Sequence, residues 1–201
     1  LILTARNERE LRKLKSEFET EYKNKVEIIP LDLSKDDAPF ELYNSCKSKN
    51  ISMLINNAGF GVFGKFAVSD LQSELDMLKV NIRAVHILTK LFLKDFREKN
   101  SGIILNVASS AGFMPGPLLA SYYASKSYVV NLTVAINEEL RREKSKVKVS
   151  LLCPGPVDTK FNQRAGVNFN IKSASSEYVA KYALEQTFKN KLIIVPTVRM
   201  K

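Results

Sequence analysis

Short apolar runs alternate with long amphipathic stretches along the whole chain, and this alternation limits the folds that it can adopt. The apolar runs are rich in branched residues and almost continuously hydrophobic, which is typical of strands buried on both faces of a parallel sheet. The predicted strands cover residues 1–4, 26–29, 51–55, 103–107, 147–152 and 192–195. The predicted helices cover residues 7–22, 36–49, 69–98, 121–144 and 175–189. This order predicts an α/β fold, a doubly wound parallel sheet between two layers of helices.

The 201 residues suit one domain with a sizeable core, and we predict a single domain over residues 1–201. The sequence contains no internal repeat, low-complexity segment or linker. One stretch is irregular, since Pro154 to about Ser176 holds Gly155, Pro156 and Gly166. Because one more helix and strand follow it, we expect a mobile loop beside a site rather than a domain boundary.

Composition excludes several classes of protein. The hydrophobic fraction is 45%, and no run of about 18 apolar residues occurs, so no membrane span is expected. The two cysteines, Cys46 and Cys153, lie far apart in sequence, and we interpret both as small apolar residues of a reduced, cytoplasmic protein. His86 is the single histidine and has no cysteine near it in sequence, so we expect no metal site.

The formal net charge of +10 permits attraction to anions such as dinucleotide phosphates, nucleic acid or a membrane surface. Along the first predicted helix, however, lysines alternate with glutamates, as on a solvated helix face. No zinc-finger spacing or aromatic RNA-binding signature occurs. We therefore interpret the charge as a lysine-rich surface and expect no nucleic-acid partner. Binding to nucleic acid or to a membrane surface stays as an alternative that the charge alone suggests.

Small and polar residues follow each of the predicted strands. In a doubly wound sheet, ligands bind outside the carboxyl ends of the strands, where a flat cofactor needs close approach to the backbone. The segments at these ends are Ala5-Arg6-Asn7, Leu31-Asp32-Leu33-Ser34, Asn56-Asn57-Ala58-Gly59, Ala108-Ser109-Ser110-Ala111-Gly112 and Pro154-Gly155-Pro156-Val157-Asp158-Thr159. We expect them to meet at one edge of the sheet.

Tyr122 and Lys126 are four residues apart in a predicted helix and therefore share a face. A lysine ammonium beside a phenol favours the phenolate, so we expect a lowered pKa for Tyr122. A tyrosine tuned in this way can exchange a proton with a carbonyl oxygen, and Ser109 could hydrogen-bond the same oxygen. By itself a Tyr-x-x-x-Lys match is a weak signal, because most such pairs are solvated neighbours on a helix.

The order and spacing of several motifs together are a much more specific signal than the Tyr122–Lys126 pair alone. The sequence contains, in register, Asn56-Asn57-Ala58-Gly59, Asn81 in a long helix, Ser109 thirteen positions before Tyr122, then Lys126 and Pro154-Gly155. This pattern resembles the short-chain dehydrogenase/reductase family, from the first residue to about Pro196. The resemblance implies a Rossmann-like fold and an oxidoreductase that moves a hydride between a nicotinamide cofactor and a carbonyl or secondary alcohol.

The resemblance assigns catalytic roles to four residues. It makes Tyr122 the general acid/base, and Lys126 lowers the pKa of that tyrosine while binding the nicotinamide ribose. Ser109 holds the substrate oxygen. Asn81 would hold a water that links Lys126 to solvent; a structural Asn81 would instead bend the helix or satisfy a neighbouring carbonyl, and the two roles are compatible.

Two neighbouring residues compete for these roles. Ser110 lies next to Ser109, but the spacing of thirteen residues to Tyr122 favours Ser109. Tyr123 stands at the wrong distance from Lys126 for the motif, and we interpret it as a packing residue.

The resemblance also implies contacts with the adenosine half of the cofactor. Asn57, Ala58 and Gly59 would line the adenosine ribose and the nearby phosphate region. Asp32 would accept a hydrogen bond from the adenine amino group, with Leu33 beside the ring. A structural Asp32 would be a simple turn acid.

On the nicotinamide side, the implied contacts follow the fifth predicted strand. They are Pro154, Gly155, Val157 and Thr159, with the backbone at Val157 fixing the carboxamide. Asn56, in contrast, could be structural and bridge two strands.

The choice between the two nicotinamide cofactors depends on charge. An acidic residue after the second strand of the family would accept the ribose 2′-hydroxyl and repel a 2′-phosphate. Here that position offers Thr4-Ala5-Arg6, with no carboxylate before Glu8. Arg6 can pair with a phosphate through its guanidinium fork, which favours NADP(H) over NAD(H). The alternative is an exposed arginine without a ligand.

The family opens with a strand, a Thr-Gly-x-x-x-Gly-x-Gly turn and a helix, and the sequence contains none of these. In the family's strand order, residues 1–4 and 51–55 would lie on either side of that first strand. We therefore expect one further βα unit of about thirty residues before Leu1, and an incomplete C-terminal end. Without that unit the cofactor pyrophosphate would lose its helix N-terminus.

The substrate is specified only in outline. An apolar pocket is expected because aromatic residues and a methionine flank the motifs: Phe60, Phe63, Phe113, Met114 and Phe161. A 3-oxoacyl thioester, a steroid, a sugar and a small ketone all stay open. The family resemblance implies a homodimer or homotetramer. A catalytically silent dinucleotide-binding regulatory or scaffold protein of the same fold is the alternative function.

Overall fold

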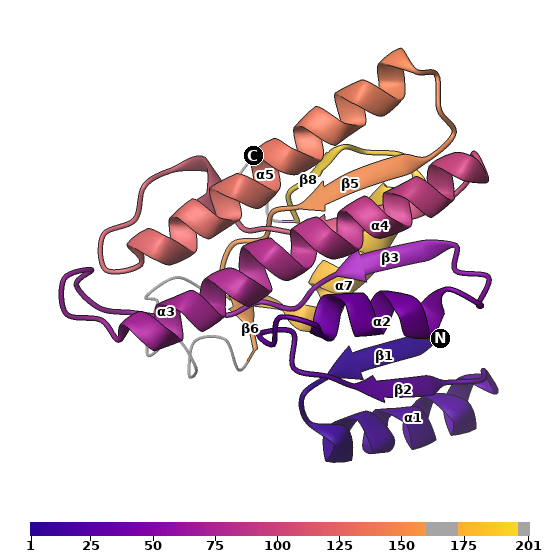
Figure 1. Ribbon diagram of the computed structural model, residues 1–201, viewed down its shortest axis with the longest axis horizontal. Helices are drawn as coiled ribbons and strands as arrows, with labels where there is room; N and C mark the ends of the chain where they lie inside the picture. Colours follow the sequence, from indigo (N-terminus) through magenta and orange to yellow (C-terminus); the bar gives the residue numbers. More distant parts are fainter. Residues whose placement is uncertain (160–172, 197–201) are drawn as a thin grey trace.

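The structure, a computed structural model, describes residues 1–159 and 173–196. Parallel strands alternate with helices along the chain (Figure 1). The strands are β1 (Ile2–Ala5), β2 (Glu27–Pro30), β3 (Met53–Asn56), β4 (Ile103–Val107), β5 (Lys148–Leu152), β6 (Val157–Asp158), β7 (Ala174–Ser175) and β8 (Ile193–Ile194). The helices are α1 (Glu8–Tyr22), α2 (Ala38–Cys46), α3 (Leu71–Leu78), α4 (Val85–Glu98), α5 (Ala120–Arg142) and α7 (Ser176–Phe188), with the turns η1 (Lys79–Ala84) and η2 (Ser110–Phe113). The predicted α/β fold is confirmed.

The strands form three separate parallel groups in the described residues. β1 pairs with β2, β6 pairs with β7, and the order in the largest sheet is β3-β4-β5-β8. The prediction of burial on both faces holds for β4 and β5 but is wrong for β1, β2 and β3, whose residues are mostly half-buried. In β3, for example, Ile55 is 47% exposed.

The main sheet carries its core on both faces. Ile104 and Val149 point to one face, where they pack with side chains of α2, α4 and α5. Leu105 and Leu152, with the alternate orientation along the same strands, pack with α7 on the other face. Figure 1 shows α7 behind the sheet and α4 and α5 in front of it. These three layers fix the positions of the strand ends.

Three helices begin at capping residues that the sequence supplies. Asn7 accepts a hydrogen bond at the start of α1, and Ser175 does so at the start of α7. Asp70 caps α3, whereas Ser69, which could also have capped it, hydrogen-bonds the Glu74 carboxylate instead. Pro39 lies in the first turn of α2, where its missing N–H is tolerated.

The long predicted helix over residues 69–98 is interrupted. α3 and α4 are joined by η1, a π-helical segment of six residues in which the turns are one residue wider. Asn81 lies in η1 and is fully buried. The continuous α-helix predicted here is therefore replaced around Asn81 by a π-helical segment.

The irregular stretch after β5 contains two strands that the sequence did not predict. β6 and β7 have two residues each and pair in parallel. Residues 160–172, which include the predicted pocket residue Phe161 and most of the predicted mobile loop, lie outside the described residues.

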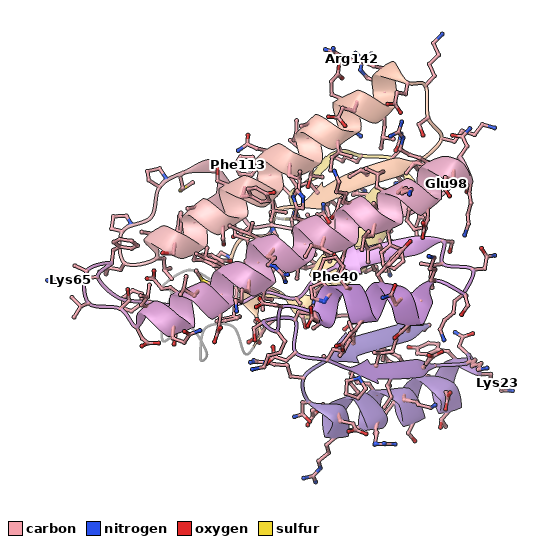
Figure 2. The ribbon with its side chains drawn as sticks, in the orientation of Figure 1. Lys23, Phe40, Lys65, Glu98, Phe113 and Arg142 are labelled. Carbon is pink, nitrogen blue, oxygen red and sulfur yellow. The ribbon has the colours of Figure 1, made fainter. Side chains whose placement is uncertain are left out.

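Most charged residues of the described chain lie on the surface. Figure 2 shows Lys23, Lys65, Glu98 and Arg142 on the outside of the molecule, and all four are exposed. Along α1, Lys13 and Lys15 each lie 3.8 Å from a glutamate one turn later. No helix of the described chain has the length and apolar character needed to cross a membrane. Across residues 1–159 and 173–196, no three metal-ligating side chains gather at one point.

Candidate active site

Tyr122 and Lys126 lie in the first two turns of α5 on one face of the helix. Both are buried, with 8% of Tyr122 and 5% of Lys126 exposed. The Lys126 ammonium lies 5.9 Å from the centre of the Tyr122 ring. The predicted pair is therefore formed, and it faces the interior rather than solvent, which separates it from an ordinary helix-surface neighbour pair.

Ser109 follows β4 and begins η2 in an extended conformation. Its hydroxyl accepts a hydrogen bond from the backbone N–H of Ala111 at 3.1 Å. It is also within hydrogen-bonding reach of the Tyr122 hydroxyl, and this contact lowers the pKa of that phenol. The structure thus brings Ser109 to Tyr122, whereas Ser110 uses its backbone N–H to bind Pro154 across the strand ends.

The pKa of Tyr122 differs from the expectation. The sequence predicts a lowered pKa, but burial raises it to about 12, opposed by the Ser109 hydrogen bond and reinforced by the neighbouring Tyr123. Burial is the largest cause of this shift. Lys126 donates its hydrogen bond to the Val107 carbonyl oxygen at 2.9 Å.

Lys126 occupies an unusual environment for a cation. Burial lowers its pKa to about 8, opposed by the nearby Cys153 thiol. Burial also raises the pKa of that thiol to about 12. Both cysteines are free and buried, as expected for small apolar residues. Lys126 therefore loses its proton more readily than an ordinary lysine, and it lies close to Tyr122.

Three hydrogen bonds to two residues hold the Asn81 side chain in place. Its amide donates to the Phe60 carbonyl at 2.9 Å and to the Ser125 hydroxyl at 3.0 Å. Its oxygen accepts from the Phe60 N–H at 3.1 Å. The structural role proposed for Asn81 is therefore present, and its place next to α5 leaves it close to Lys126. Gly59 lies between the two, since a Cβ there would be 3.1 Å from Asn81 Oδ1 and 3.2 Å from Lys126 Nζ.

Behind the site, a chain of buried polar side chains links β3, β4, α4 and α5. Asn56 donates to Asn106 at 2.8 Å and to Thr89 at 3.0 Å. Asn106 in turn donates to Thr133 at 3.0 Å. The structural reading of Asn56 is confirmed. Sequence reasoning missed Asn106, although a polar residue within the apolar run 103–107 was a visible signal.

The cofactor residues predicted for the adenosine side lie at the ends of β1, β2 and β3. Burial opposes ionisation of Asp32, but hydrogen bonds from the Ser34 backbone and hydroxyl, together with the charge of Arg6, lower its pKa. Arg6 itself is exposed and Leu33 is half-buried. Asp32 therefore stabilises the turn in which it lies, as expected of a structural turn acid. It also lies near enough to Arg6 to be affected by its charge.

The remaining predicted residues lie at the same edge, since the strand arrows of both larger sheets point to one side in Figure 1. Asn57, Ala58 and Gly59 are exposed directly after β3. After β5, the segment with Pro154, Gly155, Val157 and Thr159 continues into β6. Tyr123 packs its ring against Gly116, where a Cβ would approach to 2.4 Å, as expected of a packing residue.

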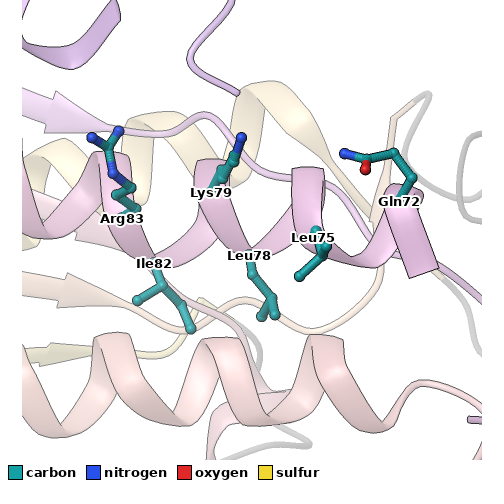
Figure 3. A pocket seen from close by; sticks show the side chains of 6 residues that line it. All are labelled: Gln72, Leu75, Leu78, Lys79, Ile82 and Arg83. Atoms are coloured by element: carbon teal, nitrogen blue, oxygen red, sulfur yellow. The ribbon is translucent and has the colours of Figure 1, made fainter. Parts of the chain in front are cut away.

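A shallow groove of about 380 Å³ lies elsewhere, along α3 and η1. Figure 3 shows Leu78 and Ile82 pointing toward α5, whereas Lys79 and Arg83 point to the other side. Both of these cations lie within 4 Å of Asp36. None of the groove's lining residues belongs to the predicted site, and the paired charges leave no free cation in it.

The sequence of the chain is similar to those of known proteins. Residues 1–168 match the family described as short chain dehydrogenase. The chain is 27% identical over 176 residues to human 17-beta-hydroxysteroid dehydrogenase type 3, covering 87% of the chain and 56% of that protein. It is 31% identical over 147 residues to a very-long-chain 3-oxoacyl-CoA reductase of Laccaria bicolor, covering 71% of the chain and 44% of that protein.

Among solved structures, a short-chain dehydrogenase from Sphingobium yanoikuyae in complex with NADPH superposes with a TM-score of 0.92 at 24% identity, over 98% of this chain and 78% of that one. This likeness shows the Rossmann-like fold. The chain spans about half the length of the curated relatives that it matches.

Proposed function

This chain belongs to the short chain dehydrogenase family of oxidoreductases, and on that premise we propose that it transfers a hydride between NADP(H) and a carbonyl or secondary alcohol, with Tyr122 as the general acid/base. The observation that carries the proposal is the convergence of Ser109, Tyr122, Lys126 and Asn81 at the carboxyl edge of the sheet.

The protein groups have separate tasks in this reaction. Because the pKa of Tyr122 is raised to about 12, its hydroxyl is protonated at neutral pH and can give its proton to a carbonyl oxygen. Ser109 is close enough to Tyr122 to hydrogen-bond the same oxygen and orient it. Lys126, with a pKa of about 8, keeps a positive charge near neutral pH that stabilises the phenolate left behind.

The cofactor supplies the hydride when it is bound. The residues that would hold it fit a flat dinucleotide, because the strand ends carry small residues, and Gly59 leaves open the space between Asn81 and Lys126 that a Cβ would crowd. Asn57, Ala58 and Gly59 would contact the adenosine ribose and phosphate region. Pro154, Gly155, Val157 and Thr159 would frame the nicotinamide.

The preference for NADP(H) rests on Arg6. It is exposed at the end of β1, where its guanidinium can pair with a 2′-phosphate, and no carboxylate precedes Glu8. Solved neighbours hold NADPH or NAD, so they do not decide the preference. Arg6→Gln should raise the KM for NADPH but not for NADH. Arg9→Gln, an exposed arginine one turn later in α1, is the matched control.

The substrate we propose is an apolar carbonyl compound, a steroid or a 3-oxoacyl thioester. Phe60 is half-buried beside Tyr122, and Phe63, Phe113 and Met114 are large side chains that are between 45% and 57% exposed at the same end of the molecule. The names of the curated relatives point to the same two classes. Activity with a small sugar ketone and none with either class would overturn this part.

The decisive experiment is oxidation of NADPH with a panel of steroid, acyl thioester and simple ketones. The wild type should oxidise NADPH with at least one ketone, and Tyr122→Phe should lose on the order of 100-fold or more in kcat. Tyr123→Phe, which loses a hydroxyl from the adjacent ring, should keep its rate. Equal rates for wild type and Tyr122→Phe would remove the mechanism and favour a silent dinucleotide-binding scaffold.

Two further proposals concern the cellular location and the oligomeric state of the protein. We propose a cytoplasmic location, consistent with two free cysteines, and a homodimer or homotetramer. Light scattering during size-exclusion chromatography measures the second directly. A monomer at micromolar concentration would contradict it.

A further inference from the structure

A carboxylate is buried between α3 and α5, outside the residues to which the proposed function assigns a role. Glu74 lies in the first turn of α3 and is 9% exposed. One of its oxygens accepts from the Ser69 hydroxyl at 2.6 Å, and the other accepts from the Ser121 hydroxyl at 2.8 Å. Within residues 1–159 and 173–196, no lysine, arginine or histidine forms an ion pair with it. A buried charge without a counterion needs other compensation.

The start of α5 supplies part of that compensation. The residue before the helix is Leu119, whose side chain cannot cap it, and the first turn of α5 contains no acidic residue. The N-terminal end of a helix carries a partial positive charge, which favours a nearby carboxylate. Glu74 accepts a hydrogen bond from the hydroxyl of Ser121, the second residue of α5, so its carboxylate lies at this end of the helix.

This contact adjoins the catalytic tyrosine. Ser121 directly precedes Tyr122, so its position fixes the backbone from which the phenol projects. Met77 lies three residues after Glu74 on α3, is fully buried, and packs in one cluster with Leu119 and Tyr122. α3 thus holds the first turn of α5 by a polar contact and by an apolar one, and both are adjacent to the phenol.

We propose that Glu74 is a positioning residue, which through Ser121 fixes the first turn of α5 and with it the place of the Tyr122 hydroxyl against Ser109. The kinetic consequence rests on the proposed oxidoreductase function, whereas the structural consequence does not. Glu74 contacts neither Ser109 nor Tyr122 among its hydrogen bonds, so it acts only through the helix.

The kinetic test compares Glu74→Ala, Glu74→Gln and Ser121→Ala in the full chain. Glu74→Ala and Ser121→Ala should lower kcat on the order of tenfold to a hundredfold, while the KM for NADPH stays within about twofold, because misplacement of a reacting group affects the chemical step. Glu74→Gln keeps an acceptor oxygen and should recover part of the loss. The double variant should be no slower than Glu74→Ala, since both changes break one contact.

Asp70→Ala is the matched structural control. It removes the side-chain cap of α3, a hydrogen bond of 2.7 Å to the Ser73 N–H, without touching Ser121. It should lower Tm as Glu74→Ala does and leave kcat unchanged. Wild-type kcat in Glu74→Ala, additive losses in the double variant, or an equal kcat loss in Asp70→Ala would each overturn the proposal.

A second readout does not depend on activity. Backbone amide hydrogen exchange over residues 120–124 should speed up in Glu74→Ala and Ser121→Ala and stay at the wild-type rate in Asp70→Ala. If the wild type oxidises no NADPH with any ketone, the proposed function fails, and the exchange rates alone decide the positioning role. Unchanged exchange in both Glu74→Ala and Ser121→Ala would refute it.

Discussion

Lys126 donates its hydrogen bond to the carbonyl oxygen of Val107 at 2.9 Å, while its ammonium stays 5.9 Å from the Tyr122 ring centre. The lysine is thus tied to the last residue of β4 and not to the phenol that it is expected to assist. Burial is the largest influence on the pKa values of both residues, raising that of the tyrosine and lowering that of the lysine.

The buried lysine should make stability depend on pH. The pKa of Lys126 falls from 10.5 in the unfolded chain to about 8 in the folded one, so between these values the unfolded state binds more protons. Its contribution should therefore disfavour folding below about pH 8 and fade as pH rises toward 10.5, a gain of roughly 3 kcal/mol at most. Urea unfolding of wild type and Lys126→Met at several pH values measures the difference, and parallel curves for the two proteins would contradict this account.

Gly59→Ala should impair the site more than the fold. The added Cβ would lie 3.1 Å from Asn81 Oδ1 and 3.2 Å from Lys126 Nζ, so one of these side chains must shift. We expect kcat/KM to fall on the order of tenfold or more and the free energy of unfolding to change by about 1 kcal/mol or less. Steady-state kinetics and urea melts separate the two effects. A variant with full activity would show that the site tolerates the shift.

Asn106→Leu should destabilise the protein by about 2 kcal/mol. The change leaves the Asn56 amide with Thr89 as its remaining described partner and removes the donor to Thr133, while the leucine enters a fully buried position. Chemical denaturation measures the loss. A free energy of unfolding equal to that of the wild type would mean that the polar chain does not contribute to stability.

Ser150→Ala, on the neighbouring strand, is not expected to destabilise the protein as Asn106→Leu does. Ser150 lies in β5 opposite Leu105 of β4, and its buried hydroxyl has no hydrogen-bond partner in the described part of the chain. Removing an unsatisfied buried hydroxyl should be neutral or should stabilise the fold by about 1 kcal/mol. Thermal and urea melts test this. A clear destabilisation would reveal a partner for the hydroxyl.

The sequence predicted the elements that have strong periodicity and the residues that follow strands. Ser109, Tyr122 and Lys126 converge because parallel strands end at one edge and because residues four apart share a helix face. The pKa of Tyr122 was predicted in the wrong direction, since it depends most on burial, which spacing does not encode.

Other features depend on contacts between distant segments. Glu74 and Ser121 are 47 residues apart, and nothing in either local pattern marks their contact. The π turn at Asn81 adds one residue to a turn without changing the apolar character of the helix, so periodicity could not show it. β6 and β7 have two residues each, which is too short for any alternation to appear.

The buried link between Asn56 and Asn106 also has a consequence for how the chain assembles. β3 is otherwise an apolar run, Met53-Leu54-Ile55, that could pair with β4 in more than one alignment. Because side chains alternate between faces, a slip of one residue would turn Asn56 away and leave the Asn106 oxygen in an apolar interior without that donor. The Asn56–Asn106 hydrogen bond therefore favours the native alignment of β3 and β4 over alignments shifted by one residue.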